Sequence, residues 1–100
     1  MQSNDYLDDP ALHKLIREKI AQGAYRIRVH ARGRLEQREV NLLDVLYVLE
    51  YGVHEKEKTL YDLKHQTWKY AIRGKTEEAA TLRVIIAFYY EMFIITVIKL

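Results

Sequence analysis

Apolar residues recur at helical spacing in the first half of the chain. One stripe, with intervals of three and four residues, consists of Leu12, Leu15, Ile16 and Ile20. This spacing predicts an amphipathic helix. Asp9 would begin it as N-cap with Pro10 in the first turn, and Gly23 would end it. The acidic, polar residues 1–8 are expected to form a loose arm before this helix.

A second helix is predicted for Asn41–Glu50. Its start resembles a capping box, because Asn41 can accept a hydrogen bond from the backbone N–H of Asp44 and Asp44 can reach back to that of Asn41. Gly52 would end this helix. The broad apolar face that it would bury consists of Leu42, Val45, Leu46, Val48 and Leu49.

Other segments predict β-strands: three of them alternate apolar with polar or basic residues, and the two nearest the C-terminus are rich in β-branched and aromatic residues. The predicted strands are 25–29, 53–61, 67–74, 82–89 and 92–98. In the first of them, Val29 would face the core and Arg28 would face solvent or a polyanion. The second is highly charged and would lie at a sheet edge. The last two reverse direction at Tyr90-Glu91 without the usual glycine or asparagine.

Together these segments predict an α+β domain in which two to three N-terminal helices pack on a C-terminal antiparallel sheet of three to four strands. One domain would span residues 1–100, mainly helical over 9–52 and sheet over 53–100. The longest apolar segment, 82–100, is interrupted by charged residues, so no membrane span is expected. The N-terminus lacks a secretory signal. We therefore expect a cytoplasmic protein without a membrane partner.

Composition narrows the possible chemistry. The chain contains no cysteine, which excludes disulfides and thiolate nucleophiles, and its only serine, Ser3, lies in the predicted arm. No glycine loop for phosphate occurs, and the net charge of +2 permits nucleic-acid binding without arguing for it. Neither a metal nor a cofactor is expected, since metal-ligand spacing is missing among the four histidines, which are His13, His30, His54 and His65.

The densest group of chemically capable residues lies before the capped helix. Segment 30–38 predicts a two-turn helix that would place His30, Arg34 and Arg38 in one narrow arc. Such a cluster suits a substrate that supplies its own nucleophile, as RNA does with its 2′-hydroxyl, because histidine can transfer protons and arginine can hold phosphate. A purely structural role is equally open, because histidine can cap a helix and arginine can pair with surface carboxylates. Candidate substrate-binding residues on the following sheet are Lys69, Tyr70 and Arg73.

An ordered set of motifs runs through this region and beyond. It consists of His30-Ala31-x-x-Arg34-Leu35-x-x-Arg38-x-Val40, then Asp44-Val45, Leu49 and Gly52, then Tyr70 and Gly74, and finally Ile94-Ile95-Thr96-Val97. With the preceding helix, this set resembles the family called domain of unknown function 4258 over about residues 12–99. The chain departs from the family pattern at Leu35, where methionine is usual, and at Tyr90-Glu91, where an Asp/Gly turn is usual.

The resemblance implies a fold related to the RelE-like, barnase and colicin ribonucleases, and a toxin of a toxin–antitoxin pair that cleaves RNA without a metal. It also implies which residues would be catalytic: His30, Arg34, Arg38 and Thr96. Tyr70 would join the substrate-binding residues. The implied partners are RNA, free or on the ribosome, and a cognate antitoxin protein. A shared fold does not by itself establish a shared reaction.

Two further functions fit the same residues. A non-enzymatic RNA- or protein-binding module could use the one tryptophan and eight tyrosines for stacking and contact, so the residues leave open whether the protein is an enzyme. A homo-oligomer could form through the aromatic segment 88–93, alongside either function.

Overall fold

The computed structural model describes residues 5–37 and 40–100, which form three α-helices and a six-stranded mixed sheet. The helices are α1 (Asp9–Ala21), α2 (Val29–Gln37) and α3 (Leu42–Tyr51), with a short 3-10 helix, η1 (Lys56–Lys58). The strands are β1 (Tyr25–Ile27), β2 (Val53–His54), β3 (Leu60–Asp62), β4 (Thr67–Lys75), β5 (Thr81–Tyr89) and β6 (Glu91–Lys99). The predicted α+β class is confirmed.

The strand order is β1-β6-β5-β4-β2, and β3 pairs with the first part of β4. β4, β5 and β6 are antiparallel neighbours, whereas β1 runs parallel to β6, with Tyr25 opposite Met92 and Ile27 opposite Ile94. The expected antiparallel sheet of three to four strands is therefore corrected to a mixed sheet of six within the described residues. The difference arises because the short strand before α2 joins the sheet at its far edge, beside the last strand of the chain.

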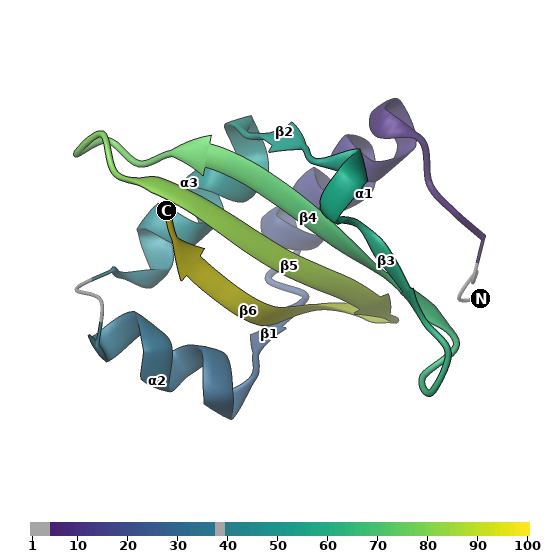
Figure 1. The fold of residues 1–100 in the computed structure, drawn as a ribbon. Helices are drawn as coiled ribbons and strands as arrows, with labels where there is room; N and C mark the ends of the chain where they lie inside the picture. The colour runs from purple at the N-terminus through teal and green to yellow at the C-terminus, as the bar shows by residue number, and fades with distance from the viewer. Residues whose placement is uncertain (1–4, 38–39) are drawn as a thin grey trace.

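Helices α1 and α3 cover one face of the sheet, and α2 lies beside its β1–β6 side (Figure 1). Their apolar stripes reach the core, where the helix residues Leu12, Ile16, Val45 and Leu49 are fully buried. The sheet residues in the same core are Tyr70, Ile72, Leu82, Val84, Ile86, Phe88, Met92, Ile94 and Val97. Full burial of one aliphatic side chain contributes about 1.5–3 kcal/mol, so this layer is the main source of stability.

A β-bulge in β6 reverses which residues face the helices. Ile85 of β5 pairs with Thr96, whereas the next residue, Ile86, pairs with Ile94, so Ile95 is an extra residue on β6. Ile94 and Val97 are buried in the core, and Ile95 and Thr96 between them are half-buried. With unbroken alternation Thr96 would share the helix-covered face with Ile94. The bulge turns it to the opposite, half-buried face.

The predicted strand 25–29 ends at Ile27, and α2 begins at Val29, one residue before the predicted helix. Arg28 is the junction: its N–H donates to the carbonyl oxygen of Ile94 at 3.0 Å, and its own carbonyl accepts from the N–H of Arg32 at 2.9 Å. Its backbone thus closes both the sheet and the first helical turn. Val29, predicted to face the core, is 89% exposed because it lies in that first turn.

Polar contacts change two other boundaries. Asp8, and not Asp9, is the N-cap of α1, and its Oδ1 accepts from the N–H of Ala11 at 3.0 Å. Asp9 instead lies 2.8 Å from Nδ1 of His54, whose Nε2 is 2.8 Å from Oγ1 of Thr59. His54 and Thr59 are both buried, and the chain between them turns through η1. The predicted strand 53–61 is therefore divided into β2 and β3.

Two local sequence signals are reproduced in the structure. The capping box of α3 is confirmed, with Oδ1 of Asn41 accepting from the N–H of Asp44 at 2.8 Å and Oδ2 of Asp44 accepting from that of Asn41 at 3.2 Å. The predicted reversal between the last two strands consists of Tyr90 alone, with φ of 64°. Lys19 donates to the carbonyl oxygen of Tyr90, so α1 supports this left-handed turn.

The described part of the N-terminal segment contacts the sheet, in contrast to the loose arm expected for residues 1–8. The backbone N–H of Leu7 donates to the hydroxyl of Tyr70 at 2.9 Å, and the ring of Tyr6 lies edge-on to Trp68 with 4.9 Å between centroids. Aromatic contacts of this kind are each worth about 0.5–1.5 kcal/mol. They explain why the segment lies against β4.

Candidate functional site

A hollow of about 240 Å³ lies on the half-buried face of the sheet. We call it the basic hollow, and its lining residues are Arg28, His30, His65, Lys69, Tyr89, Ile95 and Thr96. Three of them, His30, Lys69 and Thr96, are site residues predicted from the sequence. They come from α2, β4 and β6, so the fold brings together side chains that are far apart along the chain.

The two described members of the His-Arg motif lie one helical turn apart on α2. The Nε–H of Arg34 donates to Nε2 of His30 at 3.3 Å, which matches the shared arc predicted for these residues. Because Nε2 accepts this hydrogen bond, it carries no proton in this arrangement. Arg38, the third residue predicted for the arc, lies outside the described residues.

Arg28 and Thr96 owe their positions to the backbone of β6. Arg28 is held by the hydrogen bond to Ile94, and its guanidinium lies 5.1 Å from the centre of the Phe93 ring, a cation–π contact. Thr96 faces the hollow, with Ile95 beside it, because of the bulge. A bulge often redirects a side chain next to an active site.

Asp62, at the end of β3, contacts two residues that line the hollow, His65 and Lys69. Its Oδ2 lies 2.8 Å from Nδ1 of His65 and 3.2 Å from Nζ of Lys69, and its side chain is only 13% exposed. Its Oδ1 accepts from the backbone N–H groups of Lys64 and His65, at 3.0 and 3.2 Å. The hydrogen bond from His65 is the main reason why the pKa of Asp62 lies well below its usual range. Asp62 is therefore a carboxylate near neutral pH.

Tyr89 contributes an un-ionised hydroxyl to the hollow. Burial raises the pKa of Tyr89 above its usual value, and the negative charge of Asp62 raises it further, while Arg28 opposes the shift. Its ring lies 5.8 Å from that of Phe93 in an edge-to-face arrangement. Near neutral pH Tyr89 is thus a hydrogen-bond donor within a group of cationic and neutral side chains.

Two predicted substrate-binding residues lie elsewhere. Tyr70 faces the core on the helix-covered side of the sheet, is 3% exposed, and accepts a hydrogen bond from Leu7. Arg73 follows Lys69 by four positions on β4, a distance of about 13 Å along a strand, and its Nη1 is 3.7 Å from Oε2 of Glu55. The structure therefore does not bring Tyr70 or Arg73 into the basic hollow.

Three polar residues of the hollow, Arg28, His65 and Tyr89, were not among the predicted site residues. For Arg28, the sequence offered one signal, its outward position in an alternating segment. For His65 the signal is the spacing Asp62-x-x-His65, which lets the carboxylate bond the imidazole across a tight turn. For Tyr89 the sequence gives no such signal, because its place depends on the register of β5 against β6.

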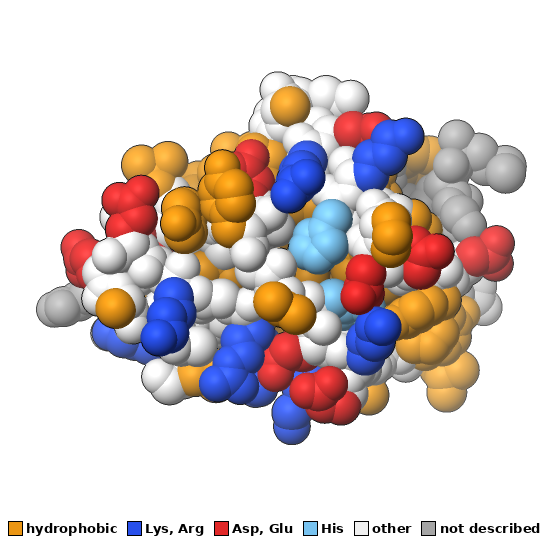
Figure 2. Space-filling view, turned by 90° about the horizontal axis from the view of Figure 1, so that it is seen from above, with side chains coloured by type: hydrophobic (Ala, Val, Ile, Leu, Met, Phe, Trp, Pro, Cys, Tyr) orange, Lys and Arg blue, Asp and Glu red, His pale blue; other side chains and the backbone are white. Residues whose placement is uncertain are grey.

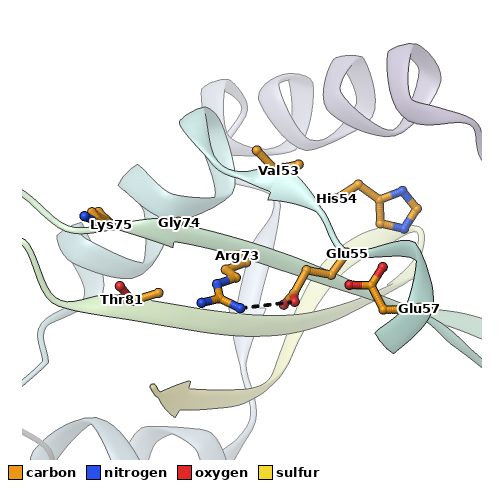
Figure 3. A pocket seen from close by; sticks show the side chains of 8 residues that line it. All are labelled: Val53, His54, Glu55, Glu57, Arg73, Gly74, Lys75 and Thr81. Atoms are coloured by element: carbon orange, nitrogen blue, oxygen red, sulfur yellow. Dashed lines mark ion pairs between the residues drawn. The ribbon is translucent and has the colours of Figure 1, made fainter.

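A second hollow, of about 560 Å³, lies between β2 and the ends of β4 and β5 and contains Glu55 (Figure 3). Figure 3 shows Arg73 and Glu55 pointing toward one another and His54 pointing away. Glu55 also forms a two-point contact with Arg83, at 2.7 Å from Nε and 3.2 Å from Nη2. The hydrogen bond from Arg83 is the main cause of the lowered pKa of Glu55. Seen from above, Lys and Arg side chains lie among Asp and Glu side chains on the same face of the molecule (Figure 2).

Replacing Glu55 by glutamine should lower the free energy of unfolding by about 2 kcal/mol at pH 7, because two arginines lose a charged partner. Since the pKa of Glu55 is lower in the folded state, its contribution is present above the usual glutamate pKa and is lost as pH falls through the folded value. Denaturant unfolding at pH 7 and pH 3 would measure this difference.

Glu57→Gln is the matched control, because Glu57 lines the same hollow but is exposed. It should change stability by less than about 0.5 kcal/mol. Equal losses for the two variants, or a Glu55→Gln loss that is the same at both pH values, would contradict the ion-pair account.

Residues 27–99 match a protein-family model described as a domain of unknown function (DUF4258). The chain belongs to this family. No curated protein and no solved structure matches the chain. The matched DUF4258 region includes every residue that lines the basic hollow, whereas α1 lies before it. The whole candidate site therefore lies within the part of the chain that matches the family.

Two other classes of site are missing from the described residues of the DUF4258 protein. Within residues 5–37 and 40–100, no helix has the length and apolar character needed to cross a membrane. In the same residues, His, Asp and Glu side chains form no group of three that could hold a metal ion.

Proposed function

We propose that this DUF4258 protein is a small endoribonuclease that needs no metal, cleaves RNA by using the 2′-hydroxyl as nucleophile, and acts as the toxin of a toxin–antitoxin pair. The observation that carries the proposal is the convergence of His30, Lys69 and Thr96 in one hollow with Arg28 beside them. The relation to RelE-like and barnase-like ribonucleases that the family resemblance implies would place the protein in the same reaction class. A cognate antitoxin protein would hold the toxin inactive.

The residues of the basic hollow divide into phosphate-binding and proton-transfer groups. Arg28 and Lys69 would neutralise the phosphate, whose charge grows as the 2′-oxygen attacks. The hydroxyls of Tyr89 and Thr96 can donate hydrogen bonds to its oxygens. Arg34 would exchange its contact with His30 for a charge-assisted contact with phosphate. That exchange would free Nε2 of His30, which could then accept the proton of the 2′-hydroxyl.

The alternative is an RNA-binding module without catalysis, and one observation favours it. Phe93 and Tyr89 form an aromatic pair on the half-buried sheet face, with Arg28 over Phe93. Such a surface can stack unpaired bases while cations hold the backbone. This function would need Arg28 and the aromatic rings but would not need His30.

The test is cleavage of a single-stranded RNA by the purified full chain in EDTA. We expect fragments that end in a 2′,3′-cyclic phosphate and a 5′-hydroxyl, because the 2′-oxygen is the nucleophile. The matched substrate is the same sequence with 2′-deoxyribose throughout, which should remain intact. Arrest of growth on induced expression, with fragmented RNA in the cells, is expected for the toxin.

Three outcomes would contradict this proposal. Cleavage of the deoxy substrate would contradict the 2′-hydroxyl mechanism. Loss of cleavage in EDTA would contradict independence from metals. RNA that binds with salt-dependent affinity but stays intact would favour the binding module, because phosphate contacts weaken as salt rises.

A further inference from the structure

Cleavage through the 2′-hydroxyl requires two proton transfers. One group removes the proton of the 2′-hydroxyl, and another protonates the 5′-oxygen as it leaves. Histidine is the side chain best suited to both tasks near neutral pH. The basic hollow contains two histidines, His30 from α2 and His65 from the turn between β3 and β4. The motifs on which the family resemblance rests include His30 but not His65.

The structure holds His65 in a defined orientation. Its Nδ1 lies 2.8 Å from Oδ2 of Asp62, a carboxylate that is itself fixed by two backbone N–H groups and by Lys69. Because Nδ1 is engaged by Asp62 and His65 lines the hollow, Nε2 is the ring nitrogen that would meet a ligand there. A carboxylate at Nδ1 orients an imidazole and stabilises its protonated form.

The two histidines of the hollow have hydrogen-bond partners of opposite charge. Nε2 of His30 accepts a hydrogen bond from the cationic Arg34 and carries no proton there. Nδ1 of His65 instead lies 2.8 Å from the anionic Asp62. Titratable groups placed in opposite environments are typical of an acid–base pair.

We infer that His65 is a catalytic residue, the general acid of the basic hollow, with Asp62 as its positioning residue; the inference rests on the proposed ribonuclease function. Nε2 of His30 takes the proton of the 2′-hydroxyl, and the 2′-oxygen forms a bond to phosphorus. The bond between phosphorus and the 5′-oxygen breaks, and its electron pair stays on that oxygen. Nε2 of His65 gives it a proton, so the products are a 2′,3′-cyclic phosphate and a 5′-hydroxyl end. No water is consumed.

The test compares ordinary RNA with an RNA whose scissile 5′-oxygen is replaced by sulfur, a leaving group that needs no proton. His65→Gln should slow single-turnover cleavage of the oxygen substrate by about 10²–10⁴-fold and that of the sulfur substrate by less than about tenfold. His30→Gln should slow both, because both reactions need the base. His13→Gln, a change on α1 outside the hollow, is the matched control and should slow neither.

Asp62→Asn is a second variant with the same expected signature. An amide cannot stabilise the imidazolium, so cleavage of the oxygen substrate should fall while that of the sulfur substrate is retained. A merely structural role of Asp62 would lower both rates together. Circular dichroism would confirm that each variant is folded.

The outcomes separate this inference from the proposed function. If wild type cleaves RNA and His65→Gln cleaves the oxygen substrate equally well, His65 is not the acid, and the ribonuclease proposal stands without it. Equal slowing of both substrates by His65→Gln would likewise overturn the inference. If wild type cleaves neither substrate, the ribonuclease function is wrong, and the role of His65 falls with it.

Discussion

Replacing Gly52 by alanine should destabilise the domain by at least about 3 kcal/mol, the upper part of the range for an enlarged side chain in a closed site. A Cβ at Gly52 would lie 2.5 Å from the carbonyl oxygen of Val48 and 2.6 Å from that of Arg73. Both oxygens belong to the backbone, one of α3 and one of β4, so relief requires an element to shift. In a domain of this size, the loss corresponds to a Tm lowered by roughly 12–24 °C. Thermal unfolding followed by circular dichroism would measure it.

Other glycines of the chain provide graded controls. A Cβ at Gly33 would meet nothing within 4 Å, and alanine is favoured over glycine inside a helix by roughly 0.5–1 kcal/mol, so Gly33→Ala should raise the Tm. A Cβ at Gly74 would lie 3.1 Å from Cα of Gly52, so Gly74→Ala should fall between the two. A Tm for Gly52→Ala as high as that for Gly33→Ala would contradict the close seating of α3 on β4.

Gly52 also illustrates how far local patterns predict a fold. The sequence predicts that it ends α3, and its N–H does donate to the carbonyl oxygen of Val48 at 2.7 Å. The need for glycine, however, comes from two close carbonyl oxygens, that of Val48 and that of Arg73 on the approaching β4, because φ at Gly52 is −79° and any residue can adopt that value. Such an approach depends on how α3 is seated on the sheet, which apolar periodicity does not encode.

Periodicity predicted the elements that have one buried face. Helices α1 and α3 and the long strands β4, β5 and β6 all agree with the expected ranges to within one residue at each end. For α1, α3 and β4, burial of one face fixes the period, and β5 and β6 follow from their β-branched and aromatic residues. The short strands β1, β2 and β3 carry too few residues for a period to specify their partners. Their pairing depends on tertiary contacts such as the parallel register of β1 with β6.

Only the part of the candidate site formed by residues close together in the sequence could be predicted from the sequence. His30 and Arg34 meet because they are one turn apart on a helix, which spacing can predict. The family resemblance singled out Thr96. It faces the hollow because of a β-bulge, and the alternation of apolar and polar residues does not predict that bulge. The position of His65 at the hollow depends on the turn between β3 and β4 and on the pairing of these strands. The pattern of apolar residues predicts neither of them.

Replacing His30 by glutamine should lower the single-turnover rate of RNA cleavage by about 10²–10⁴-fold, the usual contribution of a general base. Glutamine keeps a polar side chain of similar reach but cannot accept the proton of the 2′-hydroxyl near neutral pH. His30 is exposed on α2, so the Tm should change little. Rates would be measured with protein in saturating excess over a labelled RNA, so that changes in affinity do not enter.

Arg34→Gln separates catalysis from binding at the same helical turn. Arg34 is proposed to hold phosphate, and a hydrogen bond to a charged group is worth about 1.5–3 kcal/mol, so this variant should raise the Kd for RNA by about 10–150-fold. His30→Gln should leave that Kd within about threefold of wild type, measured by fluorescence anisotropy with uncleavable 2′-deoxy substrate. A His30→Gln variant that lost affinity but kept its saturated rate would assign His30 to binding. A variant that kept both its affinity and its saturated rate would remove His30 from the site.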